Sequence, residues 1–326
     1  MPTVINELNY KKMCVRSKRS EGFVQQKKAY VNGVLVFSAS QLITYKVDTG
    51  TTYTEEIEYG SSALAPKTFT PTKTGYTFVG WRTDNAASSS VLTEKVVDTE
   101  EFTLYAVFKK TVTLSFNGNG STSGSVASKS GTTYYNNGNK LGAMFTAPSS
   151  GFARARYAFS TWALGGASGT RYHAGDPISI TENTVAYAKW KAITFTTTKF
   201  TIHGGNNVSW DNYIKAESPA VTLISAIDLT GFSSIKLDVY KFHSDDELED
   251  ANNHGARARI KMDNTTIIEL TTHNEDDYQS SVADSGSYDC NSITGSHAIK
   301  YCYYNMNGNC KADDCYLTFT SSGLEV

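Results

Sequence analysis

The chain has 326 residues, of which 40% are hydrophobic and 19% charged, and its formal net charge is −2. These totals are ordinary for a globular protein and leave room for two or three domains of about 100–200 residues each. No apolar run approaches the roughly 20 residues that a membrane-spanning helix needs. The first residues also lack the basic-then-apolar pattern of a signal peptide. The sequence therefore predicts a protein made in a cytoplasm, with no membrane partner.

Charge is unevenly distributed along the chain. Residues 1–42 carry seven Lys/Arg and two acids, whereas residues 193–326 carry nine Lys/Arg and 19 acids. A basic arm can bind nucleic acid, but no nucleic-acid-binding motif accompanies this one. We therefore expect no nucleic-acid partner. Residues 1–42 are interpreted as a solvated face or as a dock for an acidic partner protein.

The first clear element is a β-hairpin within residues 1–42. Asn32-Gly33 lies between the apolar runs 29–31 and 34–37. Asn-Gly between such runs is a strong signal for a two-residue hairpin turn. We predict a hairpin head here, preceded by an arm or a further short strand pair.

Two later segments share one aromatic pattern. The run 75–81, which ends in Trp81, is matched by the run 157–162, which ends in Trp162. A second aromatic block follows each, at Tyr105 and Tyr187, so that the tryptophan and tyrosine are 24 positions apart in one copy and 25 in the other. Matched blocks at matched spacing indicate an internal duplication.

The duplication defines two predicted repeats, residues 43–110 and 111–192. The second is longer because of extra residues at 128–152. Alternating apolar and polar residues predict four or five short strands in each repeat. A unit of this size buries little surface, so its aromatic side chains are most simply its core, and a sugar-stacking platform is the alternative. The set is Tyr76, Phe78, Trp81, Tyr105, Phe108, Tyr157, Phe159, Trp162, Tyr187 and Trp190.

Residues 193–326 have a different character. The repeat motif is absent, and short apolar runs are separated by Gly- and Asn-containing turns. This pattern is typical of a β-sandwich of jelly-roll type. Strands are predicted at 193–200, 221–227, 234–240, 256–262, 265–270, 298–304 and 315–320.

The motif Gly75-Tyr76-Thr77-Phe78-Val79-Gly80-Trp81, together with residues 103–108, resembles the Listeria–Bacteroides repeat. That repeat is a small β-grasp-like module of bacterial surface proteins, including the internalin B repeats. It also recurs in tail and minor structural proteins of phages that infect Gram-positive gut bacteria. The second copy lacks both glycines of the motif.

The C-terminal domain is similar to galactose-binding-like sandwiches found at the ends of such phage proteins, through residues 226–235 and 289–297. The resemblance implies a virion component with spacer modules and a distal binding domain, and it implies no particular ligand contacts. The expected fold class is thus all-β: a hairpin head, two β-grasp-like repeats and a jelly-roll-type sandwich.

A loop that follows Gly204-Gly205 is the candidate ligand site. An aromatic ring can stack on the C–H face of a sugar, while neighbouring amide and carboxylate groups bind its hydroxyls. The alternative is that the tryptophan caps the sandwich. The candidate residues are Trp210, Asp211, Asn212 and Tyr213.

An acidic run at 244–250 is the candidate metal site. Hard oxygen ligands in a flexible loop suit calcium, although the spacing is not that of an EF-hand and the alternative is a solvated acidic loop. The candidate ligands are Asp245, Asp246, Glu249 and Asp250. No other cofactor is predicted.

Five cysteines are present, and four of them lie between residues 290 and 315. Their gaps do not repeat the paired short spacing of zinc ribbons. Zinc ligation, disulfides and free thiols all remain open, and a reducing cytosol favours thiols.

No nucleophile-elbow, zinc-protease or phosphate-loop motif occurs. Histidines beside acids, such as His243 near Asp245, could supply acid–base chemistry, but this pairing is common in loops. We predict a non-enzymatic phage virion protein (tail fibre, baseplate or particle-surface component), homo-oligomeric and located in the virion. Residues 1–42 would bind other virion proteins and residues 193–326 a host-surface glycan or protein. The alternatives are a bacterial surface adhesin and a glycan- or wall-degrading enzyme.

Overall fold

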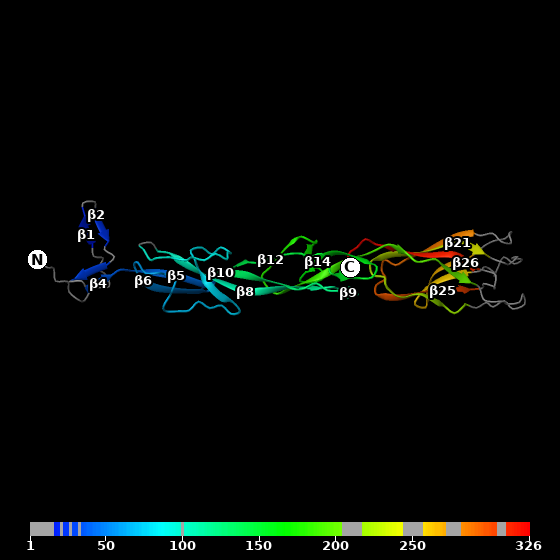
Figure 1. Ribbon diagram of the computed structural model, residues 1–326, viewed down its shortest axis with the longest axis horizontal. Helices are drawn as coiled ribbons and strands as arrows, with labels where there is room; N and C mark the ends of the chain where they lie inside the picture. Colours follow the sequence, from blue (N-terminus) through cyan, green and yellow to red (C-terminus); the bar gives the residue numbers. More distant parts are fainter. Residues whose placement is uncertain are drawn as a thin grey trace, which may run out of the picture. The chain divides into compact units, whose positions relative to one another are not determined.

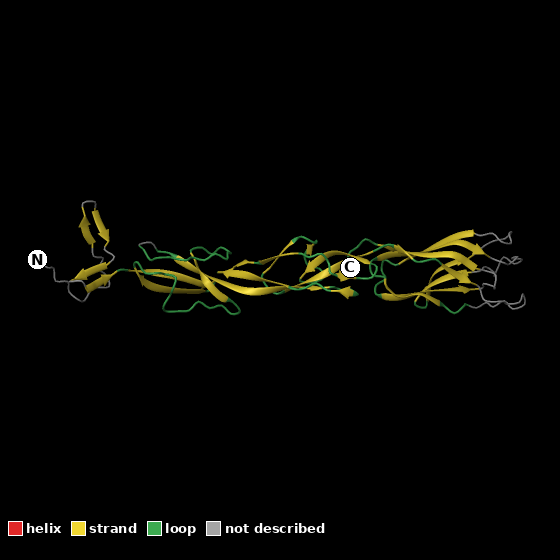
Figure 2. Ribbon diagram, in the orientation of Figure 1, coloured by secondary structure: helices red, strands yellow, loops and turns green. Residues whose placement is uncertain are grey.

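The computed structural model describes residues 16–19, 22–25, 28–31, 34–98, 101–203, 217–243, 257–271, 282–304 and 311–326. Every regular element in these segments is a β-strand (Figures 1 and 2), so the predicted all-β fold class is confirmed. Across the same segments there is no helix with the length and apolar character needed to cross a membrane.

The chain divides into two compact units, each described here by itself. Unit 1 contains Met1–Ser115, Ala127–Ala147 and Gly175–Val185. Unit 2 contains Phe116–Val126, Pro148–Ala174 and Ala186–Val326. The division falls inside the second repeat, which therefore contributes residues to both units.

Unit 1 begins with two short antiparallel strand pairs. Strands β1 (Arg16–Arg19) and β2 (Gly22–Gln25) pair with each other, as do β3 (Lys28–Val31) and β4 (Val34–Ser38). The second pair is the hairpin predicted on either side of Asn32-Gly33.

The first repeat is a mixed sheet built around one long strand. Strand β5 (Ser40–Asp48) pairs antiparallel with β6 (Thr51–Glu58) and parallel with β8 (Thr103–Asn117). Strand β7 (Thr77–Arg82) pairs antiparallel with β8. Strand β8 crosses the predicted boundary between the two repeats, at residues 110 and 111, because residues 109–111 are themselves paired with a neighbour, β10.

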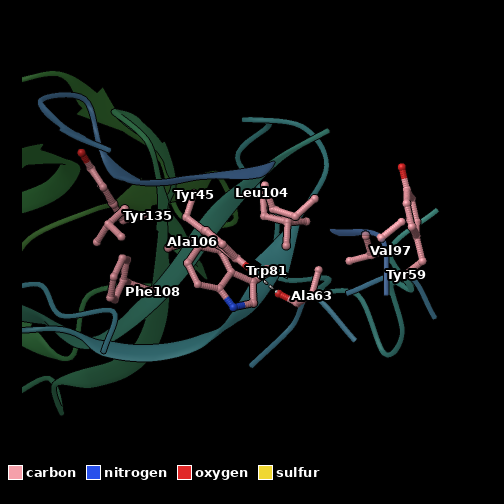
Figure 3. Packing of buried hydrophobic residues seen from close by; sticks show 12 residues of the cluster. Tyr45, Tyr59, Ala63, Trp81, Val97, Leu104, Ala106, Phe108 and Tyr135 are labelled. Carbon is pink, nitrogen blue, oxygen red and sulfur yellow. Dashed lines mark hydrogen bonds between the residues drawn. The ribbon is translucent and has the colours of Figure 1, made fainter. Parts of the chain in front are cut away.

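Trp81 lies at the centre of the first repeat's core (Figure 3), and its side chain is 1% exposed. Its ring centre lies 5.0 Å from that of Tyr45, and its indole Nε1 donates a hydrogen bond to the carbonyl of Leu64 at 3.1 Å. The Tyr45 hydroxyl donates to the carbonyl of Ala63, and burial raises the pKa of this phenol. Trp81 and Phe108 therefore belong to the core, as predicted, and form no surface platform.

The extra residues of the second repeat form strands. Within unit 1, β10 (Lys129–Asn136) pairs with β8 and with β11 (Asn139–Leu141), and β12 (Ala143–Thr146) pairs with β16 (Pro177–Ile180). Asn137 and Gly138 make the turn between β10 and β11, both with positive φ, at 45° and 93°. This β10–β11 hairpin also contacts the first repeat, since the Tyr135 hydroxyl donates to the Asp48 carboxylate.

The remainder of the second repeat belongs to unit 2. Strand β14 (Tyr157–Leu164) pairs with β17 (Thr184–Ala192) and with β15 (Arg171–Tyr172), while β9 (Ser123–Gly124) pairs with β13 (Phe152–Ala153). Trp162 is fully buried, and its indole Nε1 donates to the carbonyl of Pro148 at 2.8 Å. The second tryptophan thus repeats the arrangement of the first.

The C-terminal domain is a β-sandwich within unit 2. One sheet has the strand order β18-β26-β21-β24, with β19 also paired to β26, and the other has the order β20-β25-β22-β23. The strands are β18 (Phe195–Thr196), β19 (Phe200–His203), β20 (Val221–Asp228), β21 (Phe232–His243), β22 (Arg257–Met262), β23 (Thr265–Thr271), β24 (Val282–Asp289), β25 (Ser296–Tyr304) and β26 (Lys311–Ser321). Of these, β24 was not predicted from the sequence.

The second repeat and the sandwich are joined by specific contacts inside unit 2. Arg154 forms an ion pair with Asp228 at 2.6 Å, and the Tyr157 hydroxyl donates to the carbonyls of Asp228 and Thr230. Burial raises the pKa of Tyr157 to about 12, so its hydroxyl keeps the proton that it donates. Glu325 accepts hydrogen bonds from the Ser160 and Thr161 hydroxyls of β14. The sandwich is therefore held to the repeat by polar groups as well as by chain connection.

Candidate functional site

The outer face of the sheet that contains β21 and β26 carries polar and aromatic side chains. In β21, Ile235, Leu237 and Val239 are buried, with exposures of 0–1%. Successive side chains of a strand point to opposite faces. The residues between and after them, Lys236, Asp238 and Tyr240, therefore point outward.

Strand β26 follows the same rule. Cys315, Leu317 and Phe319 are completely buried. Tyr316 and Thr318 lie between them and are paired in register with Asp238 and Lys236 of β21. The two strands therefore place their outward side chains in adjacent rows.

A surface depression of about 530 Å³ lies on this face. Its volume is within the range of about 300–1,000 Å³ found for small-molecule sites. Its lining residues, which we call the tyrosine face, are Thr196, Lys199, Asp238, Tyr240, Asp314, Tyr316 and Thr318. All come from β18, β21, β26 and the link between β18 and β19.

Two tyrosine rings form the aromatic part of the tyrosine face. The ring centres of Tyr240 and Tyr316 are 5.7 Å apart, and the ring planes meet at 84°. Such edge-to-face pairs are favourable, and this one supports the orientation of Tyr240 seen in the structure. The side chain of Tyr240 is nevertheless 59% exposed. An exposed ring supported in this way can stack on a flat apolar surface of a ligand.

Lysines pair with the two carboxylates of the tyrosine face. Lys199 lies 2.8 Å and Lys241 3.5 Å from the Asp314 carboxylate, and Lys236 lies 2.6 Å from that of Asp238. The hydrogen bond from Lys199 lowers the pKa of the Asp314 carboxyl, and the same bond raises the pKa of Lys199. Asp314 is therefore ionised at neutral pH and acts as a hydrogen-bond acceptor.

Asp314 also has an unusual backbone conformation, with a φ of 52°. Positive φ is uncommon outside glycine, although Asp and Asn tolerate it better than most residues. The buried residues on either side, Ala312 and Cys315, are three positions apart rather than two. The strand alternation is thus interrupted at the residue whose carboxylate meets two lysines.

Two neighbouring hydroxyls complete the polar lining. The side-chain oxygens of Thr196 and Thr318 are 3.0 Å apart on paired strands. Each hydroxyl can donate one hydrogen bond and accept others. The tyrosine face therefore offers one exposed ring together with hydrogen-bond donors and acceptors in the same depression.

The site residues predicted from the sequence lie outside the described residues. This is true of Trp210, Asp211, Asn212 and Tyr213, and also of Asp245, Asp246, Glu249 and Asp250. Both the ligand loop and the calcium loop stay predictions. Within the part of the chain that the structure describes, no group of three or more His, Cys, Asp or Glu side chains could hold a metal ion.

Three of the five cysteines lie in the described segments, and all three are free and buried: Cys290, Cys302 and Cys315. Burial raises the thiol pKa to about 11 for Cys290 and to about 12 for the other two. These thiols stay protonated at neutral pH and have little nucleophilic character. Of the three alternatives left open above, free thiols describe these residues.

The sequence did not predict the tyrosine face, because apolar periodicity identifies the buried row of a strand and not its outward row. The strands over 234–240 and 315–320 were both predicted. The complementary row contains Tyr316 and Thr318, and an exposed tyrosine in that row was the available signal. What the sequence could not supply was the register that brings Tyr316 beside Tyr240.

Comparison with known families supports the duplication. Residues 42–107 and 113–189 each match the family model described as the Listeria–Bacteroides repeat domain. The resemblance seen in the sequence is therefore confirmed for both copies. These segments make up less than half of the chain, and they do not include the β-sandwich.

Two further comparisons add little. No curated protein matches the chain. Among solved structures, one match is the CBM51-2 and INT domains of ZmpB from Clostridium perfringens, at 13% sequence identity and a TM-score of 0.20. That match covers 54% of this chain and 43% of the solved one, so the chain spans less than half of that structure. A likeness this weak carries no argument about function.

Proposed function

We propose that this protein is a non-enzymatic surface component whose C-terminal sandwich binds glycan on a host cell. The observation that carries the proposal is the exposed ring of Tyr240, which is held edge-to-face by Tyr316 in a depression lined with hydroxyl, carboxylate and ammonium groups. Sugars present C–H faces for stacking and hydroxyls for hydrogen bonding. Side chains of the tyrosine face supply both kinds of contact.

In this proposal the two repeats act as spacers. Their tryptophans are buried, and each indole N–H is satisfied by a backbone carbonyl, of Leu64 for Trp81 and of Pro148 for Trp162. Both of these tryptophans are therefore used for packing. The contacts of Arg154 and Tyr157 with the sandwich support a firm connection between spacer and binding domain.

The state of Asp314 favours binding over hydrolysis. Glycosidases use one carboxyl group as a general acid, with its pKa raised, beside a second carboxylate. In the tyrosine face, the hydrogen bond from Lys199 lowers the pKa of Asp314, which is the opposite of what a general acid needs. We therefore propose a non-enzymatic role and keep a glycan-degrading enzyme as the less favoured alternative.

The particle on which the protein acts is also part of the proposal. Because the repeats resemble modules of phage tail and minor structural proteins, we propose a virion component (tail fibre, baseplate or particle surface) that is homo-oligomeric and bound to other virion proteins through residues 1–42. A bacterial surface adhesin is the second candidate, since the same repeat occurs in bacterial surface proteins. Detection of the chain in purified phage particles supports the first candidate, and its presence in host wall extracts instead supports the second.

The glycan part of the proposal is tested with the intact chain and whole bacteria. One sample of cells is treated with periodate, which oxidises sugars, and a matched sample with protease. We expect periodate to abolish binding of the labelled chain and protease to leave it intact. Loss of binding only after protease treatment would show that the receptor is a protein and would contradict the proposal. Reducing ends are assayed in parallel, and their release from wall polysaccharide would support the enzyme.

A further inference from the structure

We infer that the tyrosine face binds an internal stretch of a neutral polysaccharide, rather than a chain end or an acidic glycan. This inference rests on the proposed glycan-binding function and adds the class of glycan. It follows from three features of the face: its length along β26, the pairing of its charges, and the exposure of Tyr240.

The length of the tyrosine face exceeds a single sugar ring. Asp314, Tyr316 and Thr318 line it at every second position of β26. At about 3.3 Å per residue, these three positions span roughly 13 Å. Thr196, on the neighbouring strand, is paired with Thr318 and widens the tyrosine face at its Thr318 end. A ligand that contacts all of these side chains must therefore contain several sugars in a row.

The exposure of the lining favours a chain that lies across the surface. Tyr240 is 59% exposed, and the lysines that pair with Asp314, Lys199 and Lys241, have side chains 59% and 55% exposed. A pocket that reads the end of a glycan has to enclose a terminal sugar. The lining of the tyrosine face is accessible from solvent, and such a surface suits the middle of a chain.

The charges of the tyrosine face are already paired within the protein. Asp314 is paired with Lys199 and Lys241, and Asp238 with Lys236. A ligand charge would have to compete with these pairs. A neutral ligand does not meet this cost.

The paired charges still have hydrogen bonds to offer a neutral ligand. A carboxylate has about four acceptor sites, and an ammonium group has three donors. Asp314 and Lys199 can therefore keep their ion pair while contacting sugar hydroxyls, and the hydroxyls of Thr196 and Thr318 can do the same. Tyr240 supplies the stacking surface at the Asp314 end of the face, because the register places it opposite Asp314 on the neighbouring strand.

The inference is tested by calorimetric titration of the full chain with defined probes. The neutral probes are hexasaccharides of β-1,4-glucan, β-1,4-xylan, β-1,4-mannan and β-1,4-galactan, each with its monosaccharide, and the acidic probes are polygalacturonate and wall teichoic acid. We expect at least one neutral hexasaccharide to bind, roughly tenfold or more tighter than its monosaccharide. Because ion pairing with the ligand is absent, affinity should change less than about twofold as salt is raised across the range where surface charges become screened.

Two variants assign the binding to the tyrosine face. Tyr240→Ala removes the stacking ring and should weaken binding about tenfold or more, as expected for a central aromatic contact. Tyr240→Phe keeps the ring and should retain most of the affinity. Tyr240→Phe keeps the ring pair with Tyr316 and should leave the unfolding temperature unchanged, whereas Tyr240→Ala loses that pair and should lower the unfolding temperature by only about 2–4 °C.

Salt-sensitive, Tyr240-dependent binding of an acidic polymer would contradict the claim that the glycan is neutral. Equal affinity for a hexasaccharide and its monosaccharide would contradict the claim that an internal stretch of the chain is bound. In both cases glycan binding itself stands. If no probe binds while periodate treatment of cells still abolishes attachment, the inference is wrong and the proposed function survives. If attachment is lost only with protease, both are wrong.

Discussion

Arg156 adopts in the second repeat the left-handed backbone conformation that Gly75 adopts in the first. The two φ angles are 65° and 77°. Each residue is third in a four-residue turn closed by a backbone hydrogen bond, from Tyr76 to Lys73 at 3.0 Å and from Tyr157 to Arg154 at 3.1 Å. The duplicated turn therefore survives without its glycine, at the cost of a strained arginine.

This strain can be measured by comparing two substitutions of Arg156. Its guanidinium lies 3.7 Å from the ring centre of Phe195, a cation–π contact that contributes about 0.5–1 kcal/mol at exposed sites. Arg156→Gly loses this contact but relieves a strain of about 1 kcal/mol, so its free energy of unfolding should be close to that of the wild type. Arg156→Ala loses the contact and keeps the strain. Denaturant unfolding should show Ala less stable than Gly by roughly 1 kcal/mol, and the reverse order would contradict this account.

The core assignment of Trp81 gives a second prediction. Trp81→Ala should lower the free energy of unfolding by about 3–5 kcal/mol, the usual cost of removing a buried aromatic side chain. Trp81→Phe should cost less, because it retains most of the ring volume and loses only the hydrogen bond to Leu64. Leu42→Ala is the control, since Leu42 is 51% exposed. Unchanged unfolding of Trp81→Ala would mean that this tryptophan is not part of a packed core.

The β10–β11 hairpin gives a third prediction, for contacts within unit 1. Asn136 is 1% exposed, and its amide donates to the carbonyls of Asp84 at 3.0 Å and Ala86 at 3.1 Å. Asn136→Ala leaves both carbonyls without this donor, so we expect a cost of about 1–3 kcal/mol and faster amide hydrogen exchange in residues 82–90. Asn139→Ala is the matched control, because Asn139 makes a single exposed bond to the carbonyl of Asn85. An equal or larger loss of stability in Asn139→Ala than in Asn136→Ala would contradict the prediction.

The ion pair between Arg154 and Asp228 gives a fourth prediction, for acid stability. Burial alone would raise the pKa of Asp228, but hydrogen bonds from Thr230 and Arg154 outweigh it and set the pKa below the ordinary value of 3.8. The stabilisation is thus fully present above pH 3.8 and is lost as the pH falls through the lower pKa of the folded state. Asp228→Asn should be less stable at pH 7 and show a shallower loss of stability in acid. The measurement is the thermal unfolding temperature at a series of pH values. If the wild type and Asp228→Asn gave parallel curves of unfolding temperature against pH, the prediction would be contradicted.

Much of the fold was predictable because local patterns determined it. The alternation of aromatic and small residues before Trp81 and Trp162 predicted strands and a core, and Asn32-Gly33 predicted a hairpin. Two features depended on pairing between distant residues and were not predictable. Strand β8 continues through residues 109–111 because β10 pairs with it there. Strand β24 has few apolar residues, and its pairing with β21 defines it as a strand.

The candidate site was less predictable than the fold. Trp210 and the acidic run near Asp245 were predicted as sites because chemically distinctive residues are adjacent in the sequence there. The tyrosine face is instead assembled from β18, β21 and β26, whose residues are about 40 to 120 positions apart. Tyr240 and Tyr316 look ordinary in their own strands. Only the antiparallel register brings them to a ring separation of 5.7 Å.

The central claim is that the tyrosine face, and not the repeats, attaches the protein to cells. The most direct test compares Tyr240→Ala with Tyr53→Ala in the intact chain, on a bacterial strain that binds the wild-type protein. Tyr53 is the matched control, because it is an exposed tyrosine (42%) in the first repeat. The account predicts that Tyr240→Ala reduces the bound fraction about tenfold or more and that Tyr53→Ala leaves it unchanged. Equal binding by both variants, or a loss with Tyr53→Ala alone, would contradict it.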